Sequence, residues 1–271
     1  MTATAPRLDW QFQLLDLRPS RPQPILVPAP PPVEPGQSAA VSRLRAALDP
    51  AVAARLLNGS ELIRALQKSR REEVIPTTLE PLDALLAGGL LRGKVVEVVS
   101  RRSTGRFAVA MSALAAATST GEAAALIDLG DHFDPQLGEA AGIDLRRLLW
   151  IRPKTLKEAV MSTEMITATG FQLVVLDVGL HPIRGRRVPG AAWVRLARTA
   201  ESHGAAMLIS SPYPLTGTAS EAVVKSGGMR VKWLGQGRAP RLLAGVKTSF
   251  VLEKHRHIKP GTAASLELAE R

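Results

Sequence analysis

The sequence predicts an α/β protein with a doubly wound, mostly parallel β-sheet flanked by helices. From Val95 onward, short apolar runs alternate with longer segments whose apolar residues recur at helical spacing. Alternation of this kind is typical of β-α-β units, which form parallel sheets. The last two apolar runs have no helix between them, and Gln236-Gly237 with Pro240 predicts a turn there. That edge of the sheet is therefore expected to be antiparallel.

Each element is placed by its own residues. The expected strands are short and rich in Val, Leu, Ile and Ala: 95–99, 124–128, 148–151, 173–177, 206–209, 231–234 and 242–252. The expected helices lie between them: 107–117, 135–141, 155–168 and 191–202.

The amino-terminal region divides into two parts. Residues 1–40 hold nearly half of the prolines and are expected to form a flexible tail. Within this tail lies an apolar island, residues 8–15, that suits either a protein-docking peptide or a segment that folds back onto its own core. Its apolar residues include Trp10, Phe12, Leu14 and Leu15. Residues 41–74 show helical spacing and are expected to form two or three short helices.

The remaining chain is expected to form one core and a short tail. The core spans residues 75–260, and residues 261–271 follow as a tail. Leu266, Leu268 and Ala269 predict a final helical turn in that tail.

Composition excludes several classes of function. With no cysteine the chain has no disulfide, no thiolate zinc site and no cysteine nucleophile, and no metal or other cofactor is expected. No apolar run reaches the roughly 18 residues that span a bilayer, and the amino terminus lacks a signal-peptide pattern. A cytoplasmic protein without membrane contact is expected.

The residues that follow the first strand have the spacing of a phosphate-binding loop. In G-x-x-x-x-G-K-[ST], the glycines let backbone N–H groups approach phosphates, the Lys reaches the terminal phosphates, and the hydroxyl holds Mg²⁺. Ser100, Gly105, Arg106 and Phe107 occupy the four defining positions here, with Ser103 and Thr104 inside the loop. Arg106 keeps a positive charge in a bulkier planar form, whereas Phe107 has no oxygen to offer a metal.

Three neighbouring segments resemble the RecA-like recombinase family. The first contains Leu82-Asp83, the turn Gly88-Gly89-Leu90 and Gly93-Lys94 before the first strand. The second is the strand 125–129 with Asp134-Pro135 after it, and the third is Leu173 to Asp177, an apolar run that ends in Asp as a Walker B strand does. The resemblance implies a RecA-like core.

The same resemblance implies that three catalytic positions have changed. Phe107 stands at the position of the metal-binding hydroxyl, Gly130 at that of the catalytic glutamate and Ser211 at that of the nucleotide-sensing Gln, whereas Asp177 is retained. Loss of a general base costs about two to four powers of ten in rate. Loss of the hydroxyl that holds Mg²⁺ weakens the charge neutralisation on which phosphoryl transfer depends. We therefore expect a vestigial nucleotide site and no ATPase activity.

Positive charge is concentrated in the carboxy-terminal third. Residues 181–260 hold fourteen Lys and Arg against three Glu, an excess equal to the +11 of the whole chain. The resemblance places two basic blocks at DNA-binding loop positions, namely Arg184, Arg186 and Arg187, and then Lys225, Arg230 and Lys232. A basic patch of this kind binds phosphates with strong salt dependence. The alternative is a merely solubilising basic surface.

Among RecA relatives without catalysis, the sequence most resembles the ImuA family, RecA-like subunits of the bacterial mutasome for damage-induced translesion synthesis. That resemblance implies a nucleoid-associated adaptor with four kinds of partner: DNA, an ImuB-type polymerase-like subunit, an error-prone replicative-type DNA polymerase, and RecA. Residues 41–71 are then candidates for self-association. A SulA-like division inhibitor and a weak RecA-like ATPase are the alternatives, although a division inhibitor has no need of this basic third.

Overall fold

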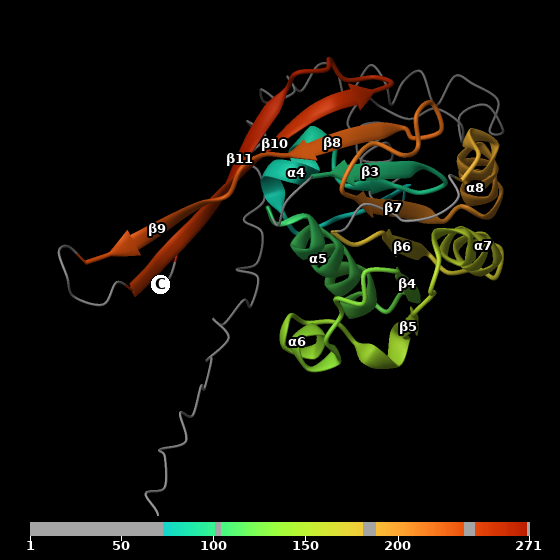
Figure 1. Cartoon of the computed structure of the whole chain (residues 1–271), viewed down its shortest axis with the longest axis horizontal. Coiled ribbons are helices and arrows are strands. Elements are labelled where there is room, and N and C mark those ends of the chain that lie inside the picture. The colour runs from blue at the N-terminus through green and yellow to red at the C-terminus, as the bar shows by residue number, and fades with distance from the viewer. Residues whose placement is uncertain (1–72, 101–103, 181–187, 236–241, 270–271) are drawn as a thin grey trace, which may run out of the picture.

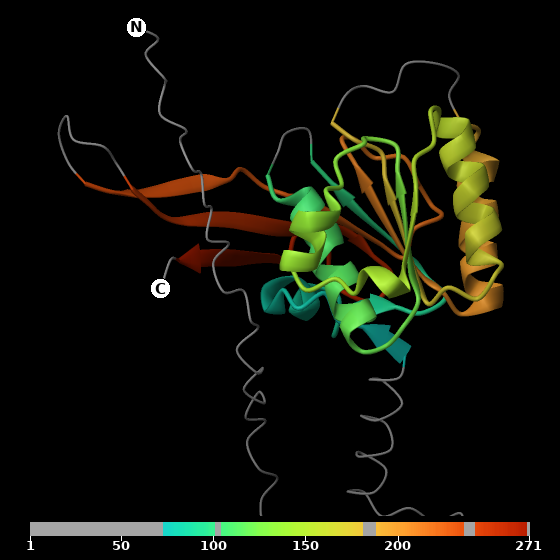
Figure 2. The same ribbon diagram turned by 90° about the horizontal axis from the view of Figure 1, so that it is seen from below.

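The structure is a computed structural model that describes residues 73–100, 104–180, 188–235 and 242–269. A single large sheet forms the middle layer, with helices on both of its faces (Figure 1). Viewed from below, α7 and α8 lie on one side of the sheet, and α4, α5 and α6 lie on the other (Figure 2). Within the described ranges, no helix is both long enough and apolar enough to cross a membrane.

The sheet is parallel through its centre and antiparallel at one end. The strand order is β11-β10-β8-β3-β7-β6-β4-β5, and β9 also pairs with β10. The six strands from β8 to β5 run parallel to their neighbours, whereas β9, β10 and β11 pair antiparallel. The strand bounds are β3 Val95–Val99, β4 Ala124–Asp128, β5 Leu148–Ile151, β6 Leu173–Asp177, β7 Ala206–Ser211, β8 Ala222–Ser226, β9 Arg230–Leu234, β10 Leu242–His255 and β11 Ala263–Ala269.

Helices on each face enclose a separate apolar core. One core packs α4 and α5 against the sheet, and the other packs α7 and α8 against the opposite face. A small antiparallel pair, β1 (Val74–Ile75) with β2 (Leu90–Leu91), brackets α4. The helix bounds are α4 Glu80–Leu85, α5 Arg106–Ser119, α6 Pro135–Ala140, α7 Leu156–Thr167 and α8 Gly190–His203, with a short 3₁₀ turn at Leu145–Arg147.

The mostly parallel sheet predicted from the sequence is confirmed. All seven expected strands and all four expected helices form within a few residues of their predicted bounds. Asp134 caps α6, because its carboxylate accepts the backbone N–H of Gln136 at 2.8 Å. The predicted antiparallel pairing of the last two runs is also confirmed as β9 with β10.

Two strands at the antiparallel end were missed. The final helical turn predicted at Leu266, Leu268 and Ala269 is wrong, because these residues belong to β11, which pairs along β10. Propensity for a helical turn is weak over so few residues, and a paired edge overrides it. The strand β8 was also not predicted, because the resemblance places Lys225 in a loop, whereas Lys225 is the one exposed residue of this otherwise buried strand.

The antiparallel end extends into a projecting arm. We define the arm as β9, the first half of β10 and the end of β11; it leaves the body of the molecule on the side away from α7 and α8 (Figures 1 and 2). The other half of β10 stays in the main sheet, where it pairs with β8. The long strand β10 is therefore shared by the arm and the main sheet.

A fully buried carboxylate fastens the loop after β7. Glu97 lies on the central strand β3 and is 0% exposed. Its oxygens accept the Ser211 hydroxyl at 2.9 Å, the Leu215 N–H at 2.7 Å and the Thr216 hydroxyl at 2.5 Å. Because a buried charge is tolerated only with several donors, this cluster holds the loop against the sheet.

A second carboxylate orders the entry to the first helix of the core. Asp83 accepts the Thr77 hydroxyl at 2.7 Å and the Thr77 backbone N–H at 2.9 Å. Burial raises the pKa of Asp83 to about 6, while the hydrogen bonds from Thr77 lower it. The protonated form is consequently favoured in the folded state relative to the unfolded chain.

Asp83→Asn should remove a pH dependence of stability. Because the pKa of Asp83 rises on folding, binding of a proton by its carboxyl stabilises the folded state. This contribution is fully present below about pH 4 and is lost as pH rises through about 6. The shift corresponds to up to about 3 kcal/mol. Urea unfolding between pH 4 and 7 should therefore show a flatter profile for Asp83→Asn than for the wild type. Glu80→Gln on the same helix controls for loss of one charge, and an unchanged profile in Asp83→Asn contradicts the prediction.

Candidate functional site

The phosphate-loop position lies between β3 and α5, at the carboxyl edge of the parallel strands. Gly105 precedes α5 with φ +92°, a left-handed conformation that favours glycine. Two hydroxyls hold the loop from neighbouring strands, because the Thr104 carbonyl accepts Ser226 Oγ at 2.8 Å and Thr248 Oγ1 at 3.1 Å. The Ser100 and Thr104 hydroxyls lie 2.5 Å apart. Ser103 lies outside the described residues.

Arg106 turns inward and pairs with the retained acid. Its guanidinium Nη1 lies 3.1 Å from Asp177 Oδ1, and both side chains are almost completely buried. Nη1 also donates to Ser210 Oγ at 2.6 Å, and Nη2 donates to the Gly179 carbonyl at 2.7 Å. The basic residue of the loop is thus bonded to the ends of β6 and β7.

The carboxylate of Asp177 is fully engaged. Its Oδ1 accepts the Ser210 hydroxyl at 2.6 Å in addition to Arg106, and its Oδ2 lies 3.3 Å from His132 Nδ1. The register of the parallel strands produces this cluster, because Asp128, Asp177 and Ser210 lie side by side on β4, β6 and β7. A row of polar residues therefore crosses the carboxyl edge of the sheet.

Burial and charge act in opposite directions on Arg106. Burial lowers the pKa of Arg106, while the negative charge of Asp177 and its hydrogen bond raise it. The guanidinium stays charged, since its ordinary pKa lies far above neutrality. Its Nε is buried with no hydrogen-bond partner in the described chain. The ion pair consequently depends on both partners being present.

Backbone fills the position that the resemblance assigns to the catalytic glutamate. A Cβ added at Gly130 would lie 2.7 Å from the Gly179 Cα and 2.6 Å from His132 Nδ1. Gly179 itself has φ +82°. The loops after β4 and β6 therefore contact each other through Gly130 and Gly179, and no room remains for a side chain between them.

Asp128, His132 and Asp177 form the one group of described residues with the spacing of metal ligands. Asp128 accepts the backbone N–H groups of His132 at 3.1 Å and Phe133 at 2.9 Å. With Asp177 bonded as above, every carboxylate oxygen of the group already has a partner in the chain, and the Arg106 cation lies beside them. These residues do not fit a bound Mg²⁺, because the Arg106 cation occupies the site of positive charge beside Asp177 and one of the three ligands is an imidazole nitrogen, whereas Mg²⁺ prefers oxygen.

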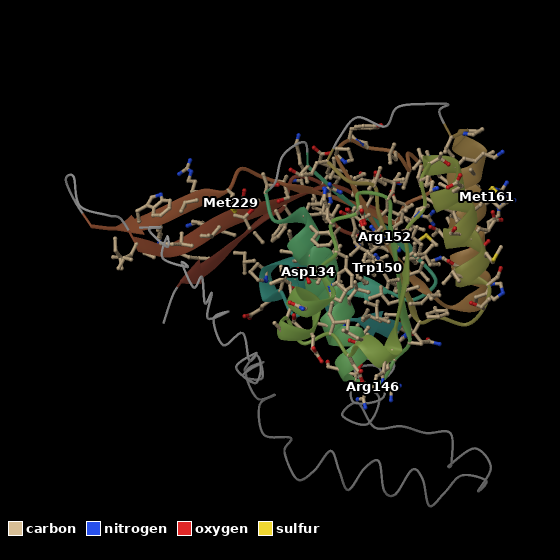
Figure 3. The ribbon with its side chains drawn as sticks, turned by 60° about the horizontal axis from the view of Figure 1, so that its bottom comes forward. Asp134, Arg146, Trp150, Arg152, Met161 and Met229 are labelled. Carbon is tan, nitrogen blue, oxygen red and sulfur yellow. The ribbon has the colours of Figure 1, made fainter. Side chains whose placement is uncertain are left out.

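Phe107 and Asp131 lie at the rim of the site. The Phe107 ring approaches His132 edge-on, with 6.0 Å between ring centroids. Asp131 faces away from the cluster and makes two 2.7 Å hydrogen bonds with Arg152. Arg152 in turn lies over the Trp150 ring at 5.0 Å, and the two residues are neighbours in Figure 3. Asp131 is thus held by a surface ion pair.

The two serines at the end of β7 point to different partners. Ser210 bonds to Arg106 and Asp177, whereas Ser211 bonds to Glu97 on the other side of the strand. Alternation along a strand explains the division. Sequence reasoning missed Ser210, Gly179 and His132 as partners; the register of adjacent parallel strands was the signal that could have identified Ser210.

The residues predicted to bind DNA are only partly described. Arg184, Arg186 and Arg187 lie outside the described residues. The loop position predicted for Lys225 and Arg230 is wrong as secondary structure, because Lys225 lies on β8 and Arg230 begins β9. Lys232 lies on β9, within the strand predicted at 231–234. Lys225 pairs with Glu253 at 3.1 Å and Lys232 with Glu267, whereas Arg230 makes no ion pair with any described residue. Their role in binding DNA stays a prediction.

Two further predictions fall where the chain is not described. Trp10, Phe12, Leu14 and Leu15 of the apolar island lie in residues 1–72, as do the helices expected at 41–71. The division of the chain at residues 40, 74 and 260 also stays a prediction.

Fold and site together define an α/β protein with the strand–loop–helix of a P-loop protein at the carboxyl edge of its sheet. The model of the RecA N-terminal domain matches residues 46–182, half of the chain. The chain belongs to this family.

Curated RecA proteins are similar to this chain over part of their length. Protein RecA of Saccharopolyspora erythraea is 39% identical over 107 residues, which cover 39% of this chain and 31% of that protein. Protein RecA of Gloeothece citriformis is 32% identical over 108 residues, covering 40% and 30%. The chain thus spans less than a third of the length of the relatives it matches.

A solved structure confirms the fold class. The crystal structure of the RadB recombinase superposes with a TM-score of 0.54 at 20% sequence identity, covering 73% of this chain and 97% of that one. The predicted RecA-like, mostly parallel sheet is therefore confirmed.

Arg106→Ala should destabilise the protein by about 3–5 kcal/mol, because it leaves the Asp177 carboxylate buried without a cation. Adding Asp177→Asn to this variant should restore part of the loss, since the remaining group is neutral. Urea unfolding measures both effects. Arg146→Ala, which removes an exposed Arg paired with Asp144, is the control and should leave stability nearly unchanged. Purely additive effects of the two substitutions in the site contradict the prediction.

Gly130→Ala should destabilise the protein by about 1–3 kcal/mol, because the new methyl group overlaps the Gly179 backbone and the His132 ring. Gly190→Ala, where nothing lies within 4 Å of the added Cβ, is the matched control and should be neutral or slightly stabilising. Thermal unfolding of both variants tests this, and equal melting temperatures contradict the close approach.

Proposed function

We propose that this protein is a non-catalytic, RecA-like adaptor that neither hydrolyses nor requires ATP. The observation that carries the proposal is the inward-turned Arg106, whose guanidinium is bonded to Asp177, Ser210 and Gly179. A P-loop cation acts by reaching the terminal phosphates, and Mg²⁺ needs a hydroxyl at the position of Phe107. In this site the cation stabilises the protein's own acid.

Removal of the general base supports the same proposal. The glutamate position is Gly130, packed against Gly179, and the neighbouring Asp131 is held by Arg152. An enzyme that stabilises the transition state of phosphoryl transfer needs a metal, a cation free to contact the γ-phosphate and a group that positions water. The described residues of this site offer no free group for any of these three roles.

We further propose that the adaptor acts in a damage-induced, mutagenic translesion synthesis complex, as ImuA proteins do. Membership in the RecA N-terminal domain family supports a role in DNA repair. In this proposal DNA contacts Arg184, Arg186, Arg187 and Arg230, with smaller contributions from Lys225 and Lys232 because these are ion-paired. The protein partners are an ImuB-type polymerase-like subunit, an error-prone replicative-type DNA polymerase and RecA. The adaptor would then be cytoplasmic and associated with the nucleoid.

The nucleotide part of the proposal is tested by thermal shift and phosphate release. A ligand at 100 times its Kd stabilises the fold by about 2.7 kcal/mol. We expect no change in melting temperature with millimolar ATP and Mg²⁺, and no phosphate release above the buffer rate. A shift accompanied by phosphate release would instead identify an unorthodox ATPase.

The DNA part is tested by fluorescence anisotropy with a single-stranded oligonucleotide at two salt concentrations. Changing Arg184, Arg186 and Arg187 together to Ala should weaken binding about tenfold or more and reduce the slope of log affinity against log salt, because fewer counterions are released. Changing Arg146, Arg147 and Arg195 together, three cations on other surfaces, is the matched control. Equal affinities for the two triple variants would reject the loop as the DNA contact.

A pull-down from DNA-damaged bacterial cells tests the partners. Recovery of a polymerase-like subunit or RecA supports the mutasome adaptor. Recovery of a cell-division protein instead supports a SulA-like inhibitor and rejects the adaptor.

A further inference from the structure

The projecting arm carries a concentration of exposed apolar side chains. Of the eleven large apolar residues that are exposed in the described chain, six lie in this arm or at its base. Trp233 is 54% exposed and Leu243 is 46% exposed. Met229, at the base of the arm, stands apart from the labelled residues of the core (Figure 3). Exposed apolar patches of this kind mark binding surfaces.

Strand register divides the arm into two faces of different character. Val231 pairs opposite Val246 and Trp233 opposite Leu243, so these four side chains share one face, which we call the apolar face. Arg230 and Lys247 are opposite each other on the other face, where Lys232 and Lys247 also pair with Glu267. Leu234 and Leu242, opposite each other at the far end of the strand pair, also lie on this face. We call it the basic face.

The outer edge of β9 is open. β9 pairs with β10 on one side, and the described chain supplies no strand to its other side. The outer edge of β11 likewise has no strand partner in the described chain, but Ala264 and Leu266 of β11 pack against the core. An open edge that borders an apolar face is a template for an added strand. The added strand has to match both faces, with apolar residues on one side and polar or acidic residues on the other.

The amino-terminal island of this chain has that pattern. Residues 8–14 read Leu-Asp-Trp-Gln-Phe-Gln-Leu, a strict alternation of apolar and polar residues. We propose that the β9 edge binds residues 8–15 of the same chain as an added strand. Trp10 and Phe12 then cover Val231 and Trp233 on the apolar face, and Asp9 faces the cations Arg230 and Lys232.

Charge and chain length favour this occupant over a second copy of the arm. Two β9 strands paired antiparallel across a two-fold axis would bring the Arg230 and Lys232 side chains of both copies together, and like charges on facing strands are destabilising. The 58 residues between the island and β1 are able to span on the order of 190 Å when extended. The inference is independent of nucleotide and DNA binding.

Paired cysteines test the proposal directly, because the natural chain contains none. In the full-length protein, Lys232→Cys is combined in turn with a Cys at each position from 9 to 13. Neighbouring strands place facing Cα atoms at about 4.5–5.5 Å, within the range of a disulfide. We expect an intramolecular disulfide with period two, formed from Asp9, Gln11 or Gln13 but not from Trp10 or Phe12, because only the polar side shares the face of Lys232.

Two comparisons make the result decisive. Combining Gln11→Cys with Ser265→Cys on the exposed part of β11 is the matched control for the other edge of the arm, and should give no more disulfide than a random pair. Trp10→Ser with Phe12→Ser should reduce the yield of the disulfide to position 232 at least fivefold while the melting temperature stays within a few degrees. Mass spectrometry of non-reduced peptides identifies the bonds.

The outcomes separate the possible occupants. Period-two disulfides within a monomer support the proposal. Disulfides that form mainly between two chains would show that the β9 edge binds residues 8–15 of a neighbouring copy. A disulfide yield equal to that of the Ser265 control would show that residues 8–15 do not bind the β9 edge. Either of these results overturns the proposal.

Discussion

The buried ion pair between Arg106 and Asp177 is the interaction on which the rest of the site depends. Removing two charges from water is costly unless each finds partners, and here the two groups supply each other's charge. Ser210 and Gly179 complete the hydrogen bonds. The pair joins the start of α5 to β6 and β7, so α5 is held against the centre of the sheet. In other P-loop proteins, the corresponding positive charge contacts a phosphate.

The surrounding polar groups follow from this constraint. Asp177 is satisfied by Arg106 and Ser210, Asp128 by backbone N–H groups, and Glu97 by the loop after β7. Gly130 and Gly179 let the loops after β4 and β6 approach each other closely beside this cluster. A site whose carboxylates all have partners within the chain is well suited to hold a scaffold together, which agrees with the adaptor proposed above.

The antiparallel end of the sheet serves a different purpose from the parallel centre. Its long strand β10 belongs to the core at one end and to the arm at the other, so a continuous strand connects the arm to the main sheet. The arm keeps its cations partly neutralised by Glu267 on one face and Val231, Trp233, Leu243 and Val246 on the other. The basic carboxy-terminal third is therefore a structured, two-sided element as well as a source of positive charge.

The sequence by itself determined the parallel centre of the sheet, because buried strands and helices carry strong local periodicity. The altered phosphate loop stays a prediction, made from a contiguous motif together with the RecA resemblance. Tertiary structure alone decided three matters. Strand register brought Ser210 to Asp177, the meeting of two loops placed Gly179 against Gly130, and pairing with β10 made strands of β8 and β11. Each involves residues far apart in sequence, so no local pattern records them.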